Sequence, residues 1–253
     1  MPIYQLAARK GGFLRAITIK SRKITHYPFL CYNNPMEPTI EQKLLAIKQW
    51  LGTGSINIFG LPLSGKDTVG VRLAEGIGGK FLSSGLIIRS NEALSNQNYT
   101  GRGEMTPTKI FYDWVLPYFD REDLKPFPLV LSSIGRWSGE EDTVMDRART
   151  SGHEIKLAVV LNISEADVTN RWETVATLKD RGNRQDDESL EIFQRRLDEF
   201  REKTLPVILH YRNLGILVEV KADLDREVVF AELVNQIYKY VQSHREANPP
   251  AAS

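Results

Sequence analysis

Five short apolar runs recur along the chain, separated by longer segments with helical periodicity. Each run is too short for a helix, and most are rich in valine or isoleucine, which favour strands. Their apolar character is nearly continuous, which is typical of parallel strands buried on both faces. The five predicted strands are SINIF (55–59), KFLS (80–83), PLVLS (128–132), KLAVVL (156–161) and GILVEV (215–220).

Between these runs, apolar residues recur at the spacing of amphipathic helices. Strands that alternate with helices predict an α/β fold, here a five-stranded parallel sheet with helices on both faces. Pro206 lies inside the longest helical segment, and we expect it to kink or divide that helix. The helical segments are 66–77, 86–95, 107–119, 141–151, 164–177, 188–213 and 225–243.

The first 38 residues lack this periodicity and end in the breaker cluster NNPMEP. The pattern therefore predicts an arm over 1–38 and one main domain over 39–253. The main domain begins with a helix that Thr39 caps and Gly52 stops. We expect its tail, 244–253, to be frayed.

Composition adds an asymmetry of charge. The chain has 253 residues, 33 basic and 32 acidic, and a formal net charge of +1. The first 36 residues hold six of the basic groups and no acid, which leaves the remainder with a net charge of −5. This acidity disfavours nucleic acid as a partner of the main domain. The overall composition excludes the disordered, collagen-like and disulfide-rich classes.

Cys31 is the only cysteine, so the chain can form neither an internal disulfide nor a cysteine-based zinc site. No apolar stretch approaches the roughly 20 residues of a membrane span. The acid-free first 36 residues have the charge of a transit peptide, but they contain only one serine, Ser21. We expect a monomer in the cytoplasm, without a membrane partner.

The sequence GLPLSGKDT (60–68) lies between the first predicted strand and the next helix. This is the order of a phosphate-binding loop, in which glycines let backbone amides point inward and Lys66 adds a positive charge. The usual pattern has Ser or Thr where Asp67 stands, and Thr68 follows one position later. The competing interpretation is a glycine-rich turn with a surface lysine.

Arginines follow several of the predicted strands or lie in a long polar connection, where ligands of open α/β sheets bind. Taken singly, each is an ordinary surface residue. Together with a phosphate loop they suit a reaction between two phosphorylated substrates, because a guanidinium can bind two phosphate oxygens at once. These residues are Arg89, Arg136, Arg171, Arg181, Arg184, Arg195 and Arg196.

Five motifs in order resemble the nucleoside monophosphate kinases of the adenylate kinase family, over roughly residues 54–243. GLPLSGKDT is similar to the family's GxPGxGKGT, SSGLIIR (83–89) to STGDxxR, and LSSIGR (131–136) to LDGFPR. GEMTPT (103–108) resembles the glycine-led turn of the monophosphate-binding helices. RQDD followed by RRLDEFREKTLPVILHYRNLG (184–215) resembles RxDD and RLxxYxxxTxPLxxYY, the longest of the five matches.

The resemblance implies a P-loop phosphotransferase that binds ATP, Mg²⁺ and a nucleoside monophosphate, with AMP first and GMP or another acceptor also possible. It implies a monophosphate-binding insertion at about 84–120 and a short lid at about 172–184, without the zinc of some relatives. The implied ATP-binding residues are Gly60, Ser64, Gly65, Lys66, Asp67, Thr68 and Arg171. The implied monophosphate-binding residues are Ser84, Gly85, Arg89, Thr106, Arg136 and Glu140. The implied catalytic residues are Lys66, Arg136, Arg184 and Arg196.

Several positions depart from the family pattern. The two aspartates that help to order the magnesium shell are replaced by Leu86 and Ser132. Asp67 could replace them by holding a magnesium-bound water, with Thr68 as a further candidate ligand. The opposite interpretation is that Asp67 repels phosphate. Leu63 replaces a loop glycine, and Arg181 could take the part of an arginine missing near Val175.

Glu140 stands where the adenylate-selective members have glutamine. A carboxylate only accepts hydrogen bonds, so Glu140 could pair with N1 and N2 of guanine or with an exocyclic amine. The alternative is a solvated helix start within the acidic run EED. Two other functions stay open, namely another small-molecule P-loop kinase and a nucleotide-binding protein that has lost turnover.

Overall fold

A computed structural model describes residues 37–178 and 189–247. Its sheet has five parallel strands in the order β2-β3-β1-β4-β5, which confirms the predicted fold class. All residues of the central strand β1 are buried, as its continuous apolar pattern predicts. The strands are β1 (Ser55–Gly60), β2 (Lys80–Ser83), β3 (Leu129–Ser132), β4 (Ile155–Asn162) and β5 (Leu217–Lys221).

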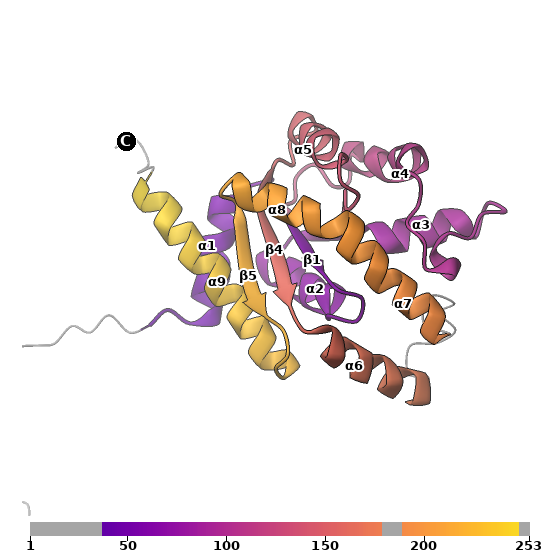
Figure 1. Cartoon of the computed structure of the whole chain (residues 1–253). Coiled ribbons are helices and arrows are strands. Elements are labelled where there is room, and N and C mark those ends of the chain that lie inside the picture. Colours follow the sequence, from indigo (N-terminus) through magenta and orange to yellow (C-terminus); the bar gives the residue numbers. More distant parts are fainter. Residues whose placement is uncertain (1–36, 179–188, 248–253) are drawn as a thin grey trace, which may run out of the picture. The chain divides into compact units, whose positions relative to one another are not determined.

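Helices cover both faces of the sheet (Figure 1). Ile56 and Ile58 of β1 point to one face, where they belong to a core shared with α1, α2 and α9. Phe59 points to the other face, into a core with α3, α4, α5 and α8. The helices are α1 (Ile40–Leu51), α2 (Lys66–Ile77), α3 (Ser84–Glu92), α4 (Thr108–Val115), α5 (Glu141–Thr150), α6 (Glu165–Leu178), α7 (Leu190–Glu199), α8 (Leu205–Asn213) and α9 (Arg226–Ala247).

The helix predicted between Thr39 and Gly52 is α1. Thr39 and Gln42 form a reciprocal capping box, and Gly52 ends the helix with φ 60°. The described residues from Pro38 onward belong to one compact unit. Among the described residues, no helix is long and apolar enough to cross a membrane.

The long segment 188–213 is divided, as Pro206 predicts. α7 ends at Glu199, a π-helical turn runs over Phe200–Thr204, and α8 begins with Pro206 in its first turn. Proline lacks the amide that would continue the α-helical ladder through this point. Such π turns often occur at functional sites, and this one reaches the candidate site described below.

Other boundaries differ by a few residues. Ser83 caps α3, so that this helix begins at Ser84 rather than 86, and it ends at Glu92 rather than 95. The segment predicted as 107–119 divides into α4 and a 3₁₀ turn at Leu116–Asp120. α6 continues to Leu178, into the predicted lid. Most of the predicted arm (1–36), the second part of the lid with Arg181 and Arg184, and the end of the tail (248–253) lie outside the described residues.

Candidate functional site

The phosphate loop connects the end of β1 to the first turn of α2. Gly65 is the N-cap of α2 with φ 90°, a conformation that favours glycine. Gly60 allows the loop to fold back, because a Cβ there would lie 2.6 Å from the Ser64 hydroxyl. Gly60 itself does not line any of the pockets described below. The loop places the amino end of α2 beside the pockets described below, where a helix dipole favours an anion.

Leu63 adopts the left-handed conformation, with φ 62°, although it is not glycine. Its side chain is buried and belongs to a small apolar cluster that joins the loop to α6 and α7 through Val168, Phe193 and Leu197. The family pattern GxPGxGKGT has glycine at this position. Leu63 thus keeps the backbone conformation that glycine would adopt at this position. The resulting strain is offset by burial of the Leu63 side chain in this cluster.

A small pocket lies beyond the carboxyl ends of three adjacent strands, β2, β3 and β1. Its accessible volume is about 60 Å³, and we call it the arginine pocket. It brings together Lys66 with Arg89, Arg136 and Arg196, from segments that are far apart in the sequence. The lining residues are Lys66, Asp67, Ser83, Ser84, Gly85, Arg89, Thr100, Gly103, Glu104, Ser132, Ser133, Arg136 and Arg196.

The cations of this pocket perturb one another. Burial, followed by the charge of Arg196, lowers the pKa of Arg136 to about 10, and Arg89 acts in the same direction. Arg136 therefore remains charged at neutral pH, but at a cost that a bound anion would remove. The backbone around Arg136 is fixed by the π turn, since the Thr204 hydroxyl donates to the Arg136 carbonyl at 3.0 Å. The pocket is a positioned site for phosphate oxygens.

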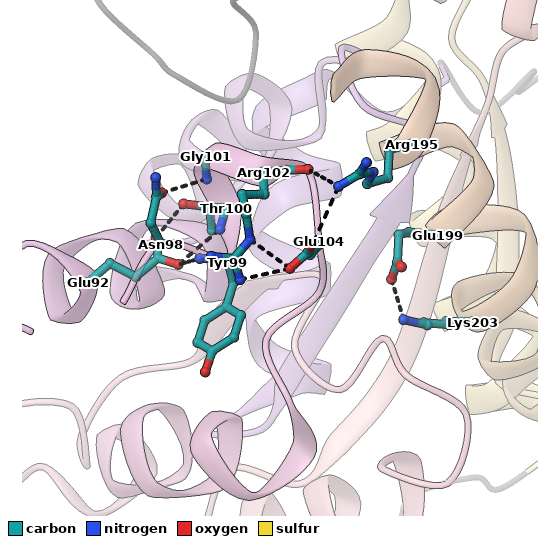
Figure 2. Close-up of polar contacts among 10 residues, drawn as sticks. All are labelled: Glu92, Asn98, Tyr99, Thr100, Gly101, Arg102, Glu104, Arg195, Glu199 and Lys203. Carbon is teal, nitrogen blue, oxygen red and sulfur yellow. Dashed lines mark hydrogen bonds and ion pairs between the residues drawn. The ribbon is translucent and has the colours of Figure 1, made fainter. Parts of the chain in front are cut away.

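The insertion between α3 and α4 contributes Thr100, Gly103 and Glu104 to the lining of the arginine pocket. Figure 2 shows the polar contacts of this insertion. The buried Glu92 carboxylate accepts hydrogen bonds from the amides of Tyr99 (2.6 Å) and Thr100 (2.9 Å), which ties the 3₁₀ turn at Thr100–Arg102 to α3. Glu104 pairs with Arg102 at 2.8 Å and with Arg195 at 3.3 Å. The insertion is therefore linked by charge to α7.

Arg195 and Arg196 separate into two roles. Arg195 faces Glu104, whereas Arg196 lines the arginine pocket. Consecutive residues of a helix point about 100° apart, and in α7 this turns Arg195 toward Glu104 and Arg196 toward the cavity. The sequence offered no signal for Thr100 in this wall, because it carries no charge and lies outside the five motifs, whereas Gly103 is the first residue of GEMTPT (103–108).

A second, larger cavity lies beyond the carboxyl ends of β1, β4 and β5. Its volume is about 420 Å³, and we call it the Arg171 pocket. The Arg171 guanidinium donates to the carbonyls of Leu63 (3.2 Å), Ser64 (3.4 Å) and Ala222 (2.7 Å). Burial lowers the pKa of Arg171. The lining residues are Leu63, Ser64, Gly65, Thr68, Val69, Arg72, Asn170, Arg171, Thr174, Ala222, Leu224, Asp225, Arg226 and Val229.

The third cavity, the Glu140 pocket, adjoins the arginine pocket and shares Ser84, Ser133 and Arg136 with it. Glu140 is only 3% exposed, so the interpretation of a solvated helix start is wrong. The turn from Trp137 to Glu140 folds the side chain inward, because the Trp137 amide donates to Glu140 Oε2 at 3.2 Å. The remaining lining residues are Ile88, Met105, Thr106, Phe111 and Trp137.

No family model matches the chain. An adenylate kinase from Methanosarcina mazei is 26% identical over 219 residues, which cover 74% of this chain and 99% of that protein. An adenylate kinase from Thermus thermophilus is 29% identical over 197 residues, with 72% and 97% covered. The chain is similar to adenylate kinases over about 70% of its length.

Two further similarities bear on this relationship. A UMP-CMP kinase from Lentinula edodes is 26% identical over 200 residues, covering 73% of this chain and 85% of that protein. The crystal structure of a gluconokinase from Sinorhizobium meliloti 1021 superposes with a TM-score of 0.53 at 18% identity, over 78% of this chain and 98% of that one. The structural similarity shows a shared fold.

The acidic residue of the site lies at a different position from those of the adenylate kinase pattern, which has aspartates where this chain has Leu86 and Ser132. Leu86 is 52% exposed and does not line the arginine pocket. Ser132 does line it, and its hydroxyl donates to the Asp67 carboxylate at 2.5 Å. The hydroxyl at the end of β3 therefore holds an acid that comes from the phosphate loop. Ser133, the next residue, is left-handed with φ 52° where the adenylate kinase pattern LDGFPR has glycine.

The predicted residues thus fall into separate groups around the loop. Lys66 and Asp67 face the arginine pocket, whereas Ser64, Gly65 and Thr68 face the Arg171 pocket. Thr106 lies in the Glu140 pocket with Glu140 itself. Gly85, Ser84 and the other predicted monophosphate-binding residues line the arginine pocket, the Glu140 pocket or both.

Proposed function

We propose that this chain is a nucleoside monophosphate kinase, which transfers the γ-phosphoryl group of ATP to a nucleoside monophosphate. The adenylate kinase and UMP-CMP kinase relatives support this phosphotransferase activity without fixing the acceptor. The observation that carries the proposal is the arginine pocket, where cations from four segments converge beside the first turn of α2.

In this proposal the two substrates approach from opposite sides of the phosphate loop. ATP places its base in the Arg171 pocket and extends its phosphates over Gly65 toward Lys66. The monophosphate binds in the arginine pocket, where Arg89 and Arg136 each have a planar guanidinium for two of its oxygens. The two phosphates then meet near Lys66, which is the orientation that an in-line transfer requires.

Catalysis in this site depends on position and charge. Lys66 and the amino end of α2 neutralise the phosphates of the donor, and Arg196 adds charge where the phosphoryl group passes. By the resemblance, Arg184 completes this group. The confined arginine pocket leaves little room for water beside bound substrates, which limits hydrolysis of ATP.

The residues present fit magnesium bound together with ATP. Among the described residues no cluster of three or more His, Cys, Asp or Glu side chains could hold a metal alone. Mg²⁺ in kinases needs no such cage, because phosphates and waters supply most of its oxygens. Asp67 would hold the ion through water, oriented by Ser132, with Thr68 as a second candidate. When bound, the ion neutralises phosphate charge.

The proposal also covers the localisation, oligomeric state and acceptor of the enzyme. We propose a cytoplasmic monomer that uses ATP and a nucleoside monophosphate and requires neither nucleic acid nor a membrane. The adenylate kinase relatives favour AMP as acceptor, whereas the carboxylate of Glu140 favours a base with more hydrogen-bond donors.

A coupled assay of ADP formation, with Mg²⁺-ATP and each of AMP, GMP, CMP and UMP, tests the proposal. We expect turnover that requires both the metal and a monophosphate. Turnover with gluconate or another small hydroxyl compound, but with no monophosphate, would assign a different P-loop kinase activity. If none is phosphorylated while ATP raises the Tm, the chain binds nucleotide without turnover.

A further inference from the structure

Glu140 has a buried carboxylate oxygen that lacks a hydrogen-bond partner. Oε2 accepts from the Trp137 amide, but Oε1 is buried without a hydrogen bond. The Thr106 hydroxyl, which lines the same pocket, is likewise buried and unpaired. Buried polar atoms are nearly always paired in folded proteins, so two such atoms in one cavity point to a ligand.

The unpaired oxygen is costly for the protein by itself. Burial raises the pKa of Glu140, which means that the cavity disfavours the carboxylate form. A side-chain hydrogen bond with Thr108, the Trp137 amide and the charge of Arg136 offset part of this cost. A glutamine of the same shape would avoid burying the charge. An interaction outside the free protein therefore explains an acid at this position.

The Glu140 pocket adjoins the arginine pocket, because Ser84, Ser133 and Arg136 line both. Its volume is about 10 Å³, so a base would enter it only as the pocket walls move apart. A nucleotide whose phosphate is held by Arg136 would direct its base toward Glu140. Phe111, Met105 and Trp137 supply apolar surfaces for the faces of the base.

We propose that Glu140 makes a guanine nucleotide, GMP, the preferred phosphoryl acceptor of this enzyme. The inference rests on the proposed kinase function and names its acceptor. A carboxylate accepts hydrogen bonds only. Guanine presents two adjacent donors, N1–H and the N2 amine, which match the two carboxylate oxygens. Thr106 is available to the neighbouring carbonyl O6.

The other bases match this carboxylate less well. Adenine and cytosine each have a ring nitrogen acceptor next to their amine. When the amine donates to one carboxylate oxygen, this nitrogen would face the other oxygen with no proton between them. Uracil has one N–H donor between two carbonyls. Only guanine offers two donors side by side, and a paired contact of this kind discriminates between bases by about 10- to 100-fold.

The test compares kcat/KM for GMP and AMP, at saturating Mg²⁺-ATP, in the full chain and in two variants. We expect the unmodified protein to favour GMP by about 10- to 100-fold. Glu140→Gln keeps the shape but both donates and accepts, so that the ratio of GMP to AMP should fall at least about tenfold. Asp142→Asn removes the same charge from an 84% exposed side chain nearby and should leave the ratio unchanged.

A second measurement separates the base preference from turnover and from folding. GMP should raise the Tm of the unmodified protein more than AMP does, and Glu140→Gln should reverse this order. If Glu140→Gln lowers kcat/KM and the rise in Tm equally for GMP and AMP, Glu140 has a structural role and the inference is overturned. A preference for AMP, CMP or UMP in the unmodified protein would also overturn it.

The failure of the kinase proposal looks different. In that case no monophosphate is phosphorylated by any variant. A GMP-dependent rise in Tm that is lost in Glu140→Gln would then still support guanine recognition, whereas no rise with any monophosphate would overturn both proposals.

Discussion

The arginine pocket and the Arg171 pocket lie on either side of the phosphate loop but are made from different halves of the sheet. The first lies beyond β2, β3 and β1, and is small and lined by cations and hydroxyls. The second lies beyond β1, β4 and β5, is about 420 Å³ in volume, and includes the apolar side chains of Leu63, Val69 and Leu224. β1 contributes to both because it is the central strand.

The difference in size and lining between the two pockets matches the part of the substrates that each would bind. Phosphates need positive charge in a fixed geometry, which arginines on several elements supply. A nucleoside base needs room and apolar surface, with few polar groups to orient it. Of the three arginines that line the Arg171 pocket, Arg171 is committed to three backbone carbonyls and braces the loop, and Arg72 is paired with Glu227.

The largest expected effect comes from removing a cation of the arginine pocket. Arg136→Ala should lower kcat/KM by about 1,000-fold, because the guanidinium would grip the acceptor and stabilise charge in the transition state. ATP affinity, measured by titration calorimetry, should change little, since Arg136 does not line the Arg171 pocket. Arg149→Ala on the exposed face of α5 is the control. A matching loss of ATP affinity would show that the two pockets do not divide the substrates.

An intermediate effect is expected at Asp67. Asp67→Asn keeps the acceptor for the Ser132 hydroxyl but loses the charge, so it should lower kcat by about 10- to 100-fold and raise the Mg²⁺ concentration for half-maximal activity. Ser132→Ala removes only the hydrogen bond to the Asp67 carboxylate, so it should lower kcat less and raise the required Mg²⁺ concentration less. If Asp67→Asn or Asp67→Gly leaves the magnesium dependence intact, Asp67 does not compensate for the missing acids. Tighter ATP binding in Asp67→Asn would mean that Asp67 repels phosphate.

On the other side of the loop, Arg171→Met should weaken ATP binding by about tenfold. The variant keeps the apolar part of the side chain but removes three hydrogen bonds that shape the loop and the Ala222 segment. The KM for the monophosphate should stay within about twofold of its original value. Exposed Arg201→Met is a control outside both cavities. An equal rise in the KM values for ATP and for the monophosphate would mean that Arg171 supports the fold rather than donor binding.

The smallest expected effect concerns stability. Leu63→Ala should lower the free energy of unfolding by about 2–3 kcal/mol, because a buried leucine is lost. Leu63→Gly should cost about 1 kcal/mol less than Leu63→Ala, since glycine relieves the left-handed strain. At Leu73, buried inside α2, the order should reverse, with glycine worse than alanine by about 1 kcal/mol. Urea unfolding measures all four variants, and the same order at both positions would refute the strain argument.

The elements of the fold were largely predictable because their signals are local. Five apolar runs predict the five strands, Thr39 and Gly52 bound α1, and Pro206 divides the segment that holds α7 and α8. Caps, periodicity and proline act over a few residues, so a linear pattern contains them. The errors are at helix ends, where Ser83 and the 3₁₀ turn at Leu116–Asp120 changed the boundaries.

The motifs also predict that Lys66, Arg89 and Arg136 serve one site, since each follows a strand whose carboxyl end lies at the same edge of the sheet. The roles of these residues in binding and catalysis stay predictions. The resemblance implies Arg196, but the position of strand ends does not say whether Arg195 or Arg196 reaches the site. It depends on the rotation of α7 against the insertion, which Glu104 and the π turn help to set.

What short-range pattern establishes here is the order of strands and helices, the phosphate loop and the list of arginines. Three features required the tertiary structure: the burial of Glu140, the hydrogen bond between Ser132 and Asp67, and the division of the loop between two cavities. Each depends on residues from separate strands meeting at one edge of the sheet. Their distance in sequence says nothing of that meeting, because strand order and helix rotation decide it.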